Sequence, residues 1–256
     1  MLTSELEQFQ GGWFDSHCHL NEVDHLLSNL NEAEQNGIRN YLVPSTESSM
    51  WASVQKLKTV HVQVALGTHP WFVKNASEEA MLLEHAIAVC RPSAIGEVGL
   101  DFYPAKTLRP SRELQLSSLE LQLNVAQKSQ LPVILHCVKA HQELIALLKH
   151  YKISAGVVHA FAGSYELAKQ YLDLGIKLGV GPALLKSYKL QTTVQKCPME
   201  SLLLETDAPF MAIEKRATNP LLDLIAVGEK VAALKKLSDI EVRTTTRENA
   251  EGLFFG

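Results

Sequence analysis

Eight short apolar runs recur along the chain with longer stretches of helical character between them, and this alternation constrains the fold more than any other feature. In chain order the runs cover residues 12–15, 38–44, 62–66, 94–97, 132–136, 156–159, 176–180 and 202–205. Several of them lack polar alternation, as expected for strands that are covered on both faces. Strands that alternate with helices predict a parallel α/β domain.

The intervening stretches carry helix signals. Residues 112–129 place apolar side chains at helical spacing, among them Leu119 and Leu123. Residues 139–151 contain a second apolar face, and Ser164 is a candidate cap for a helix that runs to Gly175. A capping box formed by residues 238 and 241 predicts a last helix, although the threonine run at 244–246 is a poor helix former.

These elements favour a (β/α)₈ TIM barrel, in a single domain over residues 1–256. An open doubly wound sheet is the alternative fold. No G-x-G-x-x-G or P-loop motif follows any of the runs, so the usual nucleotide-binding versions of that sheet are excluded.

Composition narrows the class of protein. The net charge of −4 means that the protein as a whole is not positively charged. A nucleic-acid ligand would therefore need a local basic patch or bound metal ions. The four cysteines form no C-x-x-C pair, which argues against a zinc ribbon. A polar N-terminus and the lack of a long apolar window predict a cytoplasmic protein without a membrane span. No obligate protein partner is evident.

The first run ends in an H-x-H motif. Residues two apart in an extended chain point to the same side, so His17 and His19 can aim two imidazoles at one point while Cys18 points away. Taken alone, such a motif is more often a pair of surface histidines.

Four later runs end in, or just before, a residue that binds metals, and this repetition favours a metal site. The carboxyl ends of barrel strands share one face, where active sites form. The candidate ligands are His17, His19, Glu97, His136, His159 and Asp207. Six ligands exceed what one tetrahedral ion needs, so we expect two divalent ions, with Glu97 able to bridge them. Imidazole with carboxylate suits zinc, manganese or iron better than magnesium, and the identity of the metal stays open.

Other side chains are candidates for substrate contacts. His69 follows the third run and could hydrogen-bond a phosphate or a leaving group, or cap its own loop. Trp71 and Phe72 could stack on a base or a sugar, or cover the mouth of the barrel. Arg216, after the last run, could contact a ligand or lie in a solvated loop.

These stretches resemble the TatD family of metal-dependent deoxyribonucleases, and especially its YjjV-like branch. The matching motifs are FDSHCHL at 14–20, GTHP at 67–70, AIGEVGLDFY at 94–103, LPVILH at 131–136, VVHAFAGS at 157–164, LLLETDAPF at 202–210, RATNP at 216–220 and ENAEGLF at 248–254. The resemblance implies a (β/α)₈ TIM barrel of the metallo-dependent hydrolase type, two divalent ions (Zn, Mn or Mg) and the same six ligands. It also implies hydrolysis of phosphoesters, with DNA or a small phosphoester as substrate.

Two positions depart from the family pattern. In the family, the histidine that ends the fifth run, here His136, is usually followed two residues later by an arginine. In this sequence that position is Val138. Lys139 can replace part of the missing charge, but only as a point charge, without the two parallel hydrogen bonds that an arginine can donate. Trp71 stands where many relatives carry a smaller or polar residue. Both departures leave the metal ligands intact and put a DNA substrate in question.

The predicted reaction is an attack by a metal-activated hydroxide, with Glu97 and Asp207 as catalytic residues. Asp207 would be both a ligand and the acceptor of the proton from water. Hydrolysis of an amide or an aminoacyl-tRNA ester at the same site is the first alternative. A protein that uses its metals only for binding or structure is the second, and a closed, fully coordinated site would support it.

Overall fold

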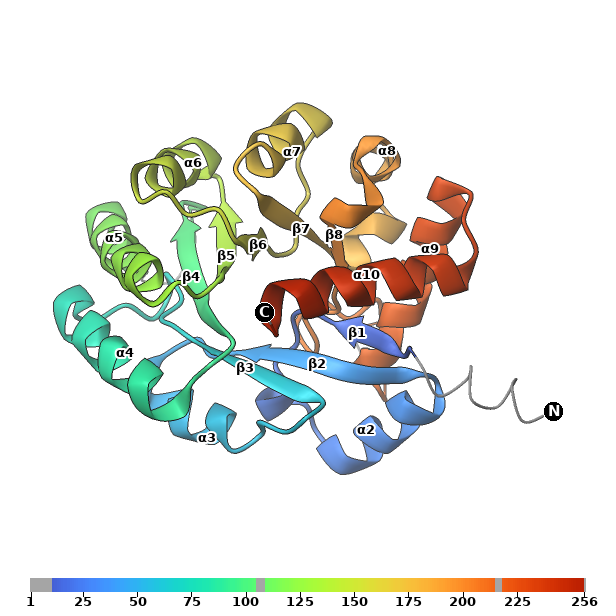
Figure 1. Ribbon diagram of the computed structural model, residues 1–256, viewed down its shortest axis with the longest axis horizontal. Coiled ribbons are helices and arrows are strands. Elements are labelled where there is room, and N and C mark those ends of the chain that lie inside the picture. The colour runs from blue at the N-terminus through green and yellow to red at the C-terminus, as the bar shows by residue number, and fades with distance from the viewer. Residues whose placement is uncertain (1–10, 105–108, 215–217, 256) are drawn as a thin grey trace. The chain divides into compact units, whose positions relative to one another are not determined.

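Eight strands alternate with helices in the computed structural model, which describes residues 11–104, 109–214 and 218–255. Their order in the sheet follows their order in the chain, β1 to β8, and the strand pairs are parallel (Figure 1). This sequential order is that of the (β/α)₈ barrel predicted from the sequence, and it excludes the strand order of a doubly wound sheet.

The strands are β1 (Trp13–Asp15), β2 (Ile38–Pro44), β3 (Val62–Leu66), β4 (Ala94–Asp101), β5 (Val133–Val138), β6 (Gly156–Val158), β7 (Ile176–Val180) and β8 (Leu202–Leu204). The helices are α2 (Leu26–Gln35), α3 (Trp51–Gln55), α4 (Ala76–Cys90), α5 (Arg112–Ser129), α6 (His141–His150), α7 (Tyr165–Leu172), α8 (Tyr188–Lys196), α9 (Asp223–Lys235) and α10 (Asp239–Phe254).

The predicted bounds are confirmed for β2, β3, β7 and α5, and those of β1, β6 and β8 differ from the structure by one residue each. Larger differences occur at three elements. β4 does not end at Glu97 but continues to Asp101, and β5 runs two residues past His136. α7 ends at Leu172, three residues before the glycine that was expected to stop it.

Side-chain caps begin two of the helices. The Ser111 hydroxyl accepts a hydrogen bond from the Leu114 amide at 3.2 Å and begins α5. Ser238 and Glu241 form the expected capping box at α10. The threonine run did not end α10, because the buried residues Val242 and Thr246 hold this face of the helix against the rest of the fold.

The contacts divide the described residues into two compact units. The first unit comprises residues 11–42, 160–169 and 178–255, and the second comprises residues 43–159 and 170–177, in both cases without the undescribed positions. The single domain over residues 1–256 therefore stays a prediction. Each unit carries one cluster of candidate metal ligands.

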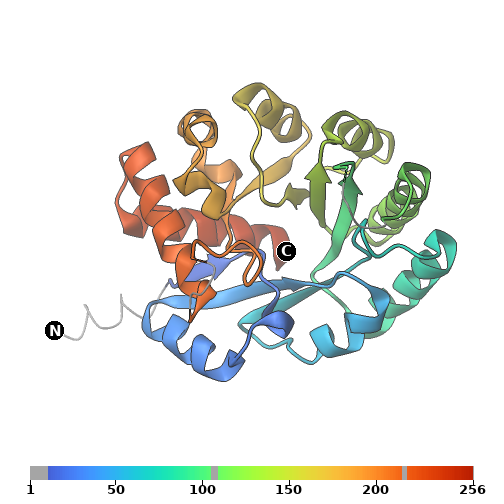
Figure 2. The same ribbon diagram turned by 180° about the vertical axis from the view of Figure 1, so that it is seen from behind.

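In the first unit, β1 has a neighbour on each side. It pairs with β2, and beyond its end the Ser16 amide donates to the Leu204 carbonyl of β8 at 2.9 Å. α10 packs along β1 (Figure 2). At this contact the ring centroids of Phe14 and Phe254 lie 6.4 Å apart. The short strand that precedes the H-x-H motif is therefore held on both edges and covered by a helix.

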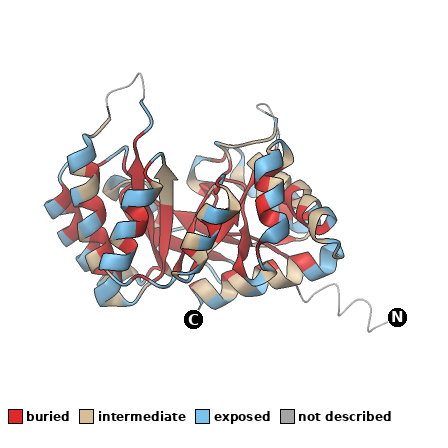
Figure 3. Cartoon of the chain, turned by 90° about the horizontal axis from the view of Figure 1, so that it is seen from above, coloured by how far each residue is buried: buried red, intermediate tan, exposed pale blue. Residues whose placement is uncertain are grey.

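In the second unit, all eight residues of β4 are buried, and α5 packs against this strand (Figure 3). α5 contributes Leu119, Leu123 and Ala126 to the contact, at the helical spacing expected from the sequence. The strands are buried while the helices expose their outer faces, which is the pattern of strands covered on both sides.

β4 contains a bulge beside the candidate ligand Glu97. Against β5, Ile95 pairs with Val133 but Val98 pairs with Leu135, so β4 holds one extra residue. Bulges re-aim side chains next to functional sites. Beyond the bulge, Gly99 has φ +151°, and a Cβ there would lie 1.9 Å from the carbonyl oxygen of His136. Only glycine allows β4 to approach β5 this closely.

Within the part of the chain that the structure describes, every helix is too short or too polar to cross a membrane.

Candidate functional site

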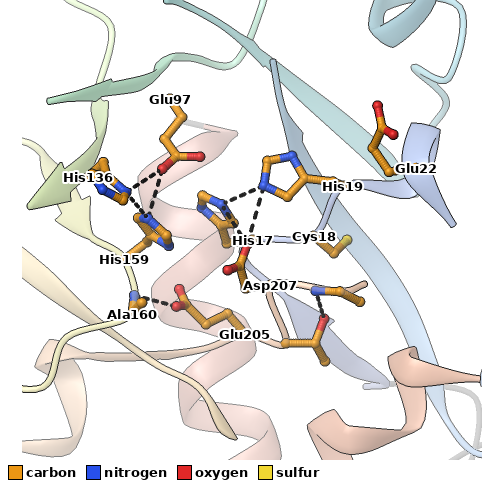
Figure 4. Close-up of polar contacts among 12 residues, drawn as sticks. His17, Cys18, His19, Glu22, Glu97, His136, His159, Ala160, Glu205 and Asp207 are labelled. Carbon is orange, nitrogen blue, oxygen red and sulfur yellow. Dashed lines mark hydrogen bonds and ion pairs between the residues drawn. The ribbon is translucent and has the colours of Figure 1, made fainter. Parts of the chain in front are cut away.

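Three side chains of the first unit converge on one point. The Nε2 atoms of His17 and His19 lie 3.3 Å apart, and the Asp207 Oδ1 lies 3.5 Å from the first and 3.3 Å from the second (Figure 4). All three residues are buried. As the alternation of an extended chain predicted, Cys18 points elsewhere, and its sulfur faces the Leu42 carbonyl.

The backbone of the first unit fixes this arrangement. Asp207 follows β8 with φ +53°, a left-handed conformation that Asp tolerates better than most residues, and its amide donates to the His17 carbonyl at 2.8 Å. The Asp15 carboxylate accepts hydrogen bonds from the His17 amide at 3.2 Å and from the Thr206 hydroxyl at 2.6 Å. Asp15 therefore ties the end of β1 to the segment after β8.

Asp15 is itself unusual, because it is fully buried. Burial raises the pKa of Asp15 to about 7, although the hydrogen bonds from Thr206 and the His17 amide oppose that change. Burial also raises the pKa of the Cys18 thiol well above its usual value, so Cys18 stays a neutral thiol. Asp15 therefore titrates near neutral pH, whereas Cys18 stays protonated there.

The second unit holds another three-residue cluster. The Glu97 Oε1 lies 2.8 Å from His159 Nε2 and 3.0 Å from His136 Nδ1, and these two nitrogens are 3.1 Å apart (Figure 4). The three residues come from β4, from β5 and from the residue after β6. Glu97 and His159 are buried, and His136 is partly exposed.

His136 is held at both ring nitrogens. Its Nε2 lies 3.3 Å from Asp101 Oδ2, while its Nδ1 faces Glu97. Glu97 and Asp101 are four residues apart on one strand and so point to the same side, which explains how both reach one imidazole. Burial alone would lower the pKa of His136, but the hydrogen bonds with Asp101 and Glu97 raise it above its usual value.

Asp101 accepts hydrogen bonds from several donors. The Trp71 Nε1 donates at 2.7 Å, the Tyr103 amide donates at 2.9 Å, and the Arg109 Nη1 lies 3.0 Å away. Burial would raise the pKa of Asp101, but the hydrogen bonds from His136, the Tyr103 amide and Trp71 lower it to about 2. Asp101 is therefore a permanent anion that favours a proton on Nε2 of His136 and leaves Nδ1 for a cation.

His69 makes the loop-capping contact, which is one of the two roles that the sequence left open, and its contact with a substrate stays a prediction. Its Nδ1 accepts a hydrogen bond from the Trp71 amide at 3.1 Å, which is a loop-capping contact. The proton of the neutral ring therefore sits on Nε2, which lies 3.4 Å from Glu97 Oε1. His69, Glu97 and His136 also place ligand atoms close enough together for a metal ion. In this tautomer, however, His69 is a donor and not a ligand.

The donor atoms fit divalent cations in both clusters. Ligands at zinc distances of 2.0–2.1 Å in a tetrahedral site lie about 3.3–3.4 Å from each other. The first cluster matches this value with separations of 3.3, 3.3 and 3.5 Å. The separations in the second cluster are 2.8, 3.0 and 3.1 Å, so its side chains must move slightly apart to hold an ion between them. Two imidazoles with one carboxylate form the three-ligand set of catalytic zinc sites, which leave a position open.

The predicted substrate contacts are less well defined. Lys139 is exposed, and its Nζ lies 4.6 Å from the centre of the Tyr103 ring, so its predicted role at the substrate stays a prediction. Arg216 lies outside the described residues. The six predicted ligands lie in the two clusters, three in each unit, and their action as one two-metal centre also stays a prediction.

Sequence reasoning missed Asp101, Arg109 and Asp15. Asp101 stands in the quoted GLDFY segment, but the strand was expected to end four residues earlier, so the carboxylate was placed beyond it. The alternation Glu97, Gly99, Asp101 on one side of a longer strand was the signal that could have identified it. No local signal marks Arg109, which precedes α5 by three residues.

Comparison with known proteins agrees with this geometry. The model of the TatD related DNase family matches residues 14–255. The uncharacterized metal-dependent hydrolase YjjV of Escherichia coli is 35% identical over 78% of this chain and 81% of its own length. A crystal structure of YjjV superposes with a TM-score of 0.87 over 95% of this chain and 98% of that chain, at 31% identity.

Two further relatives carry more specific names. The human deoxyribonuclease TATDN3 is 28% identical over 95% of this chain and 94% of its own length. The 3′-5′ ssDNA/RNA exonuclease TatD of Pantoea ananatis is 30% identical over 71% of this chain and 72% of its own length. Both the family model and the YjjV relative cover most of the chain, and the (β/α)₈ fold and the histidine–carboxylate clusters agree with them. The chain therefore belongs to the TatD related DNase family of metal-dependent hydrolases.

Proposed function

We propose that this protein hydrolyses phosphodiester bonds of DNA with two divalent ions, one at each three-residue cluster. The observation that carries the proposal is the spacing of the donor atoms, which suits a cation with an open position in each cluster. Ions in such sites lower the pKa of water and stabilise the negative charge that develops on a phosphate. Family membership supports hydrolysis of an ester bond.

The side chains have distinct roles in this proposal. Asp207 presents its Oδ1 to two imidazoles, so the carboxylate both helps to hold a cation and accepts the proton of the attacking water. Glu97 faces His136 and His159 and holds the second cation. His69 carries its proton on Nε2 and can donate it to a phosphate oxygen or a leaving group.

Asp207→Asn tests this assignment. Asparagine also tolerates positive φ, so the fold is expected to survive while most of kcat is lost. The assay compares hydrolysis of bis-p-nitrophenyl phosphate and a labelled single-stranded oligonucleotide with added Mg²⁺, Mn²⁺ or Zn²⁺. Asp239→Asn, an exposed carboxylate at the start of α10, is the matched control. Turnover of Asp207→Asn at the wild-type rate would refute the role of Asp207.

The number of ions is tested separately. Metal analysis of the purified protein is expected to give two ions per chain, and one ion for variants that lack either histidine pair, His17 with His19 or His136 with His159. A wild-type stoichiometry of one would refute the two-ion proposal. DNA as the partner, zinc or manganese as the metal and a cytoplasmic location stay predictions.

The valine at position 138 supports a second candidate reaction, hydrolysis of an amide or an aminoacyl-tRNA ester. Val138 stands where the family carries an arginine, which favours a substrate less charged than DNA, such as an amide or an aminoacyl-tRNA ester. If no metal supports cleavage of either phosphodiester while ions are bound, this second reaction is favoured. Ester and amide substrates should then be screened with the same Asp207→Asn variant as control.

A further inference from the structure

The second unit exposes aromatic side chains beside its metal-ligand cluster. The Trp71 side chain is 42% exposed, and Tyr103 is 53% exposed. The Trp71 ring centroid lies 5.1 Å from that of His69 and 6.2 Å from that of His136. A large exposed ring this close to metal ligands is in a position to contact a substrate.

Trp71 carries a stacked cation. The guanidinium carbon of Arg109 lies 4.0 Å from the centre of the Trp71 ring. Asp101 holds both partners, because it accepts the Trp71 Nε1 hydrogen bond at 2.7 Å and pairs with Arg109 at 3.0 Å. The orientation of ring and guanidinium is therefore set before a ligand arrives, which lowers the entropy lost on binding.

Asp101 also connects this pair to the metal ligands. Three contacts in series lead from Arg109 through Asp101 and His136 to Glu97, at 3.0, 3.3 and 3.0 Å. The arginine that the family carries at position 138 is absent from that position. Arg109, from the segment before α5, pairs with Asp101, which lies opposite Val138 in the sheet. Its planar guanidinium group can donate two hydrogen bonds to a phosphate.

We propose that Trp71 and Arg109 form a binding subsite for one nucleotide of a single-stranded nucleic acid. The base stacks on the Trp71–Arg109 pair, and the guanidinium binds the adjacent phosphate. This assignment rests on the proposed function, because it supplies the substrate contact next to the metal site. Stacking on an aromatic ring tolerates every base, so the subsite selects single strands and not a sequence.

Binding measured in the presence of a chelator tests the subsite apart from catalysis. The probes are a short oligothymidylate, its ribose counterpart and an abasic oligomer of the same length. Trp71→Leu is expected to weaken binding of the base-carrying oligomers by about fivefold to about 150-fold, with little change for the abasic oligomer. Arg112→Gln is the matched control for an arginine variant of the subsite, since Arg112 lies over the Phe102 ring at 4.5 Å in a similar pair that includes neither Trp71 nor Asp101.

Arg109→Gln separates a phosphate contact from a structural role. Loss of one contact to a single strand lowers the slope of log K against log salt by about 0.7. Tryptophan fluorescence gives a second readout. Of the three tryptophans, Trp13 and Trp51 are buried, so quenching by the oligomer should disappear in Trp71→Phe while binding persists.

The outcomes distinguish this inference from the proposed function. Binding of either base-carrying oligomer that depends on Trp71 and Arg109 supports the subsite, and the tighter oligomer identifies DNA or RNA as the source. Wild-type affinity and salt slope in both variants, or no binding by the wild-type protein, overturn the subsite even if phosphodiesters are cleaved. Binding that depends on both residues without cleavage under any metal overturns the proposed function and leaves the subsite in place.

Discussion

Replacing Asp101 with asparagine tests whether this carboxylate connects the Trp71–Arg109 pair to the metal ligand His136. The groups around the Asp101 carboxylate are the Trp71 Nε1, the Tyr103 amide, the Arg109 guanidinium and the His136 Nε2. An asparagine must turn its NH₂ group toward two of these groups, where it meets donors. Asp101→Asn therefore breaks hydrogen bonds in either orientation of the amide.

The magnitude follows from the pKa of Asp101. The hydrogen bonds from its partners lower the pKa from 3.8 to about 2, and about 2 units at about 1.4 kcal/mol each give roughly 2.5 kcal/mol of stability. The folded pKa lies below the unfolded pKa. This contribution is therefore present above pH about 4 and is lost as the pH falls toward about 2.

Two assays check the prediction. Urea denaturation at neutral pH should show a loss of about 2 kcal/mol for Asp101→Asn, and the difference from wild type should narrow as the pH falls below about 4. Competition with a chelator should show Zn²⁺ affinity reduced by about 10- to 100-fold, because the proton on His136 is no longer fixed at Nε2. Asp239→Asn should change stability by no more than about 0.5 kcal/mol.

The reasoning is refuted if Asp101→Asn binds Zn²⁺ with wild-type affinity and keeps wild-type stability. A loss of stability alone, with unchanged metal affinity, would make Asp101 a structural anchor. It would then have no part in positioning His136.

Two further predictions concern the scaffold. Gly99→Ala should cost about 3 kcal/mol or more, because a Cβ would overlap the His136 carbonyl and the backbone has positive φ; a urea midpoint close to wild type would contradict the close approach of β4 to β5. Ser238→Ala should cost about 1 kcal/mol in urea denaturation, since the capping box begins α10, and an unchanged stability would show that packing alone holds this helix end.

Sequence patterns identified the strands well, because the signal is local. Three strand boundaries matched, and the others differed by four residues or fewer. The largest difference, in β4, arose where Gly96 and Gly99 interrupt the apolar run. There, the bulge and the close approach to β5 favour glycine, and a bulge is visible only when the partner strand is known.

The candidate ligands could also be predicted from the sequence, because metal-binding residue types recur at or near the ends of apolar runs. Each cluster brings together side chains that are far apart in the chain, such as His17 with Asp207 and Glu97 with His159. Their mutual distances of about 3 Å depend on strand register, which the order of residues does not encode locally.

The sequence by itself determined the alternation of strands and helices, the family resemblance and the residue types of the metal ligands. Only the tertiary structure decided that Asp101 favours a proton on the Nε2 atom of His136 and that Arg109 stacks on Trp71. The physical reason is the range of the interactions. Periodicity and caps are set by neighbours a few residues away. A hydrogen bond or a stacked pair between segments 30 or more residues apart exists only once strand register, bulge and loops have placed both partners.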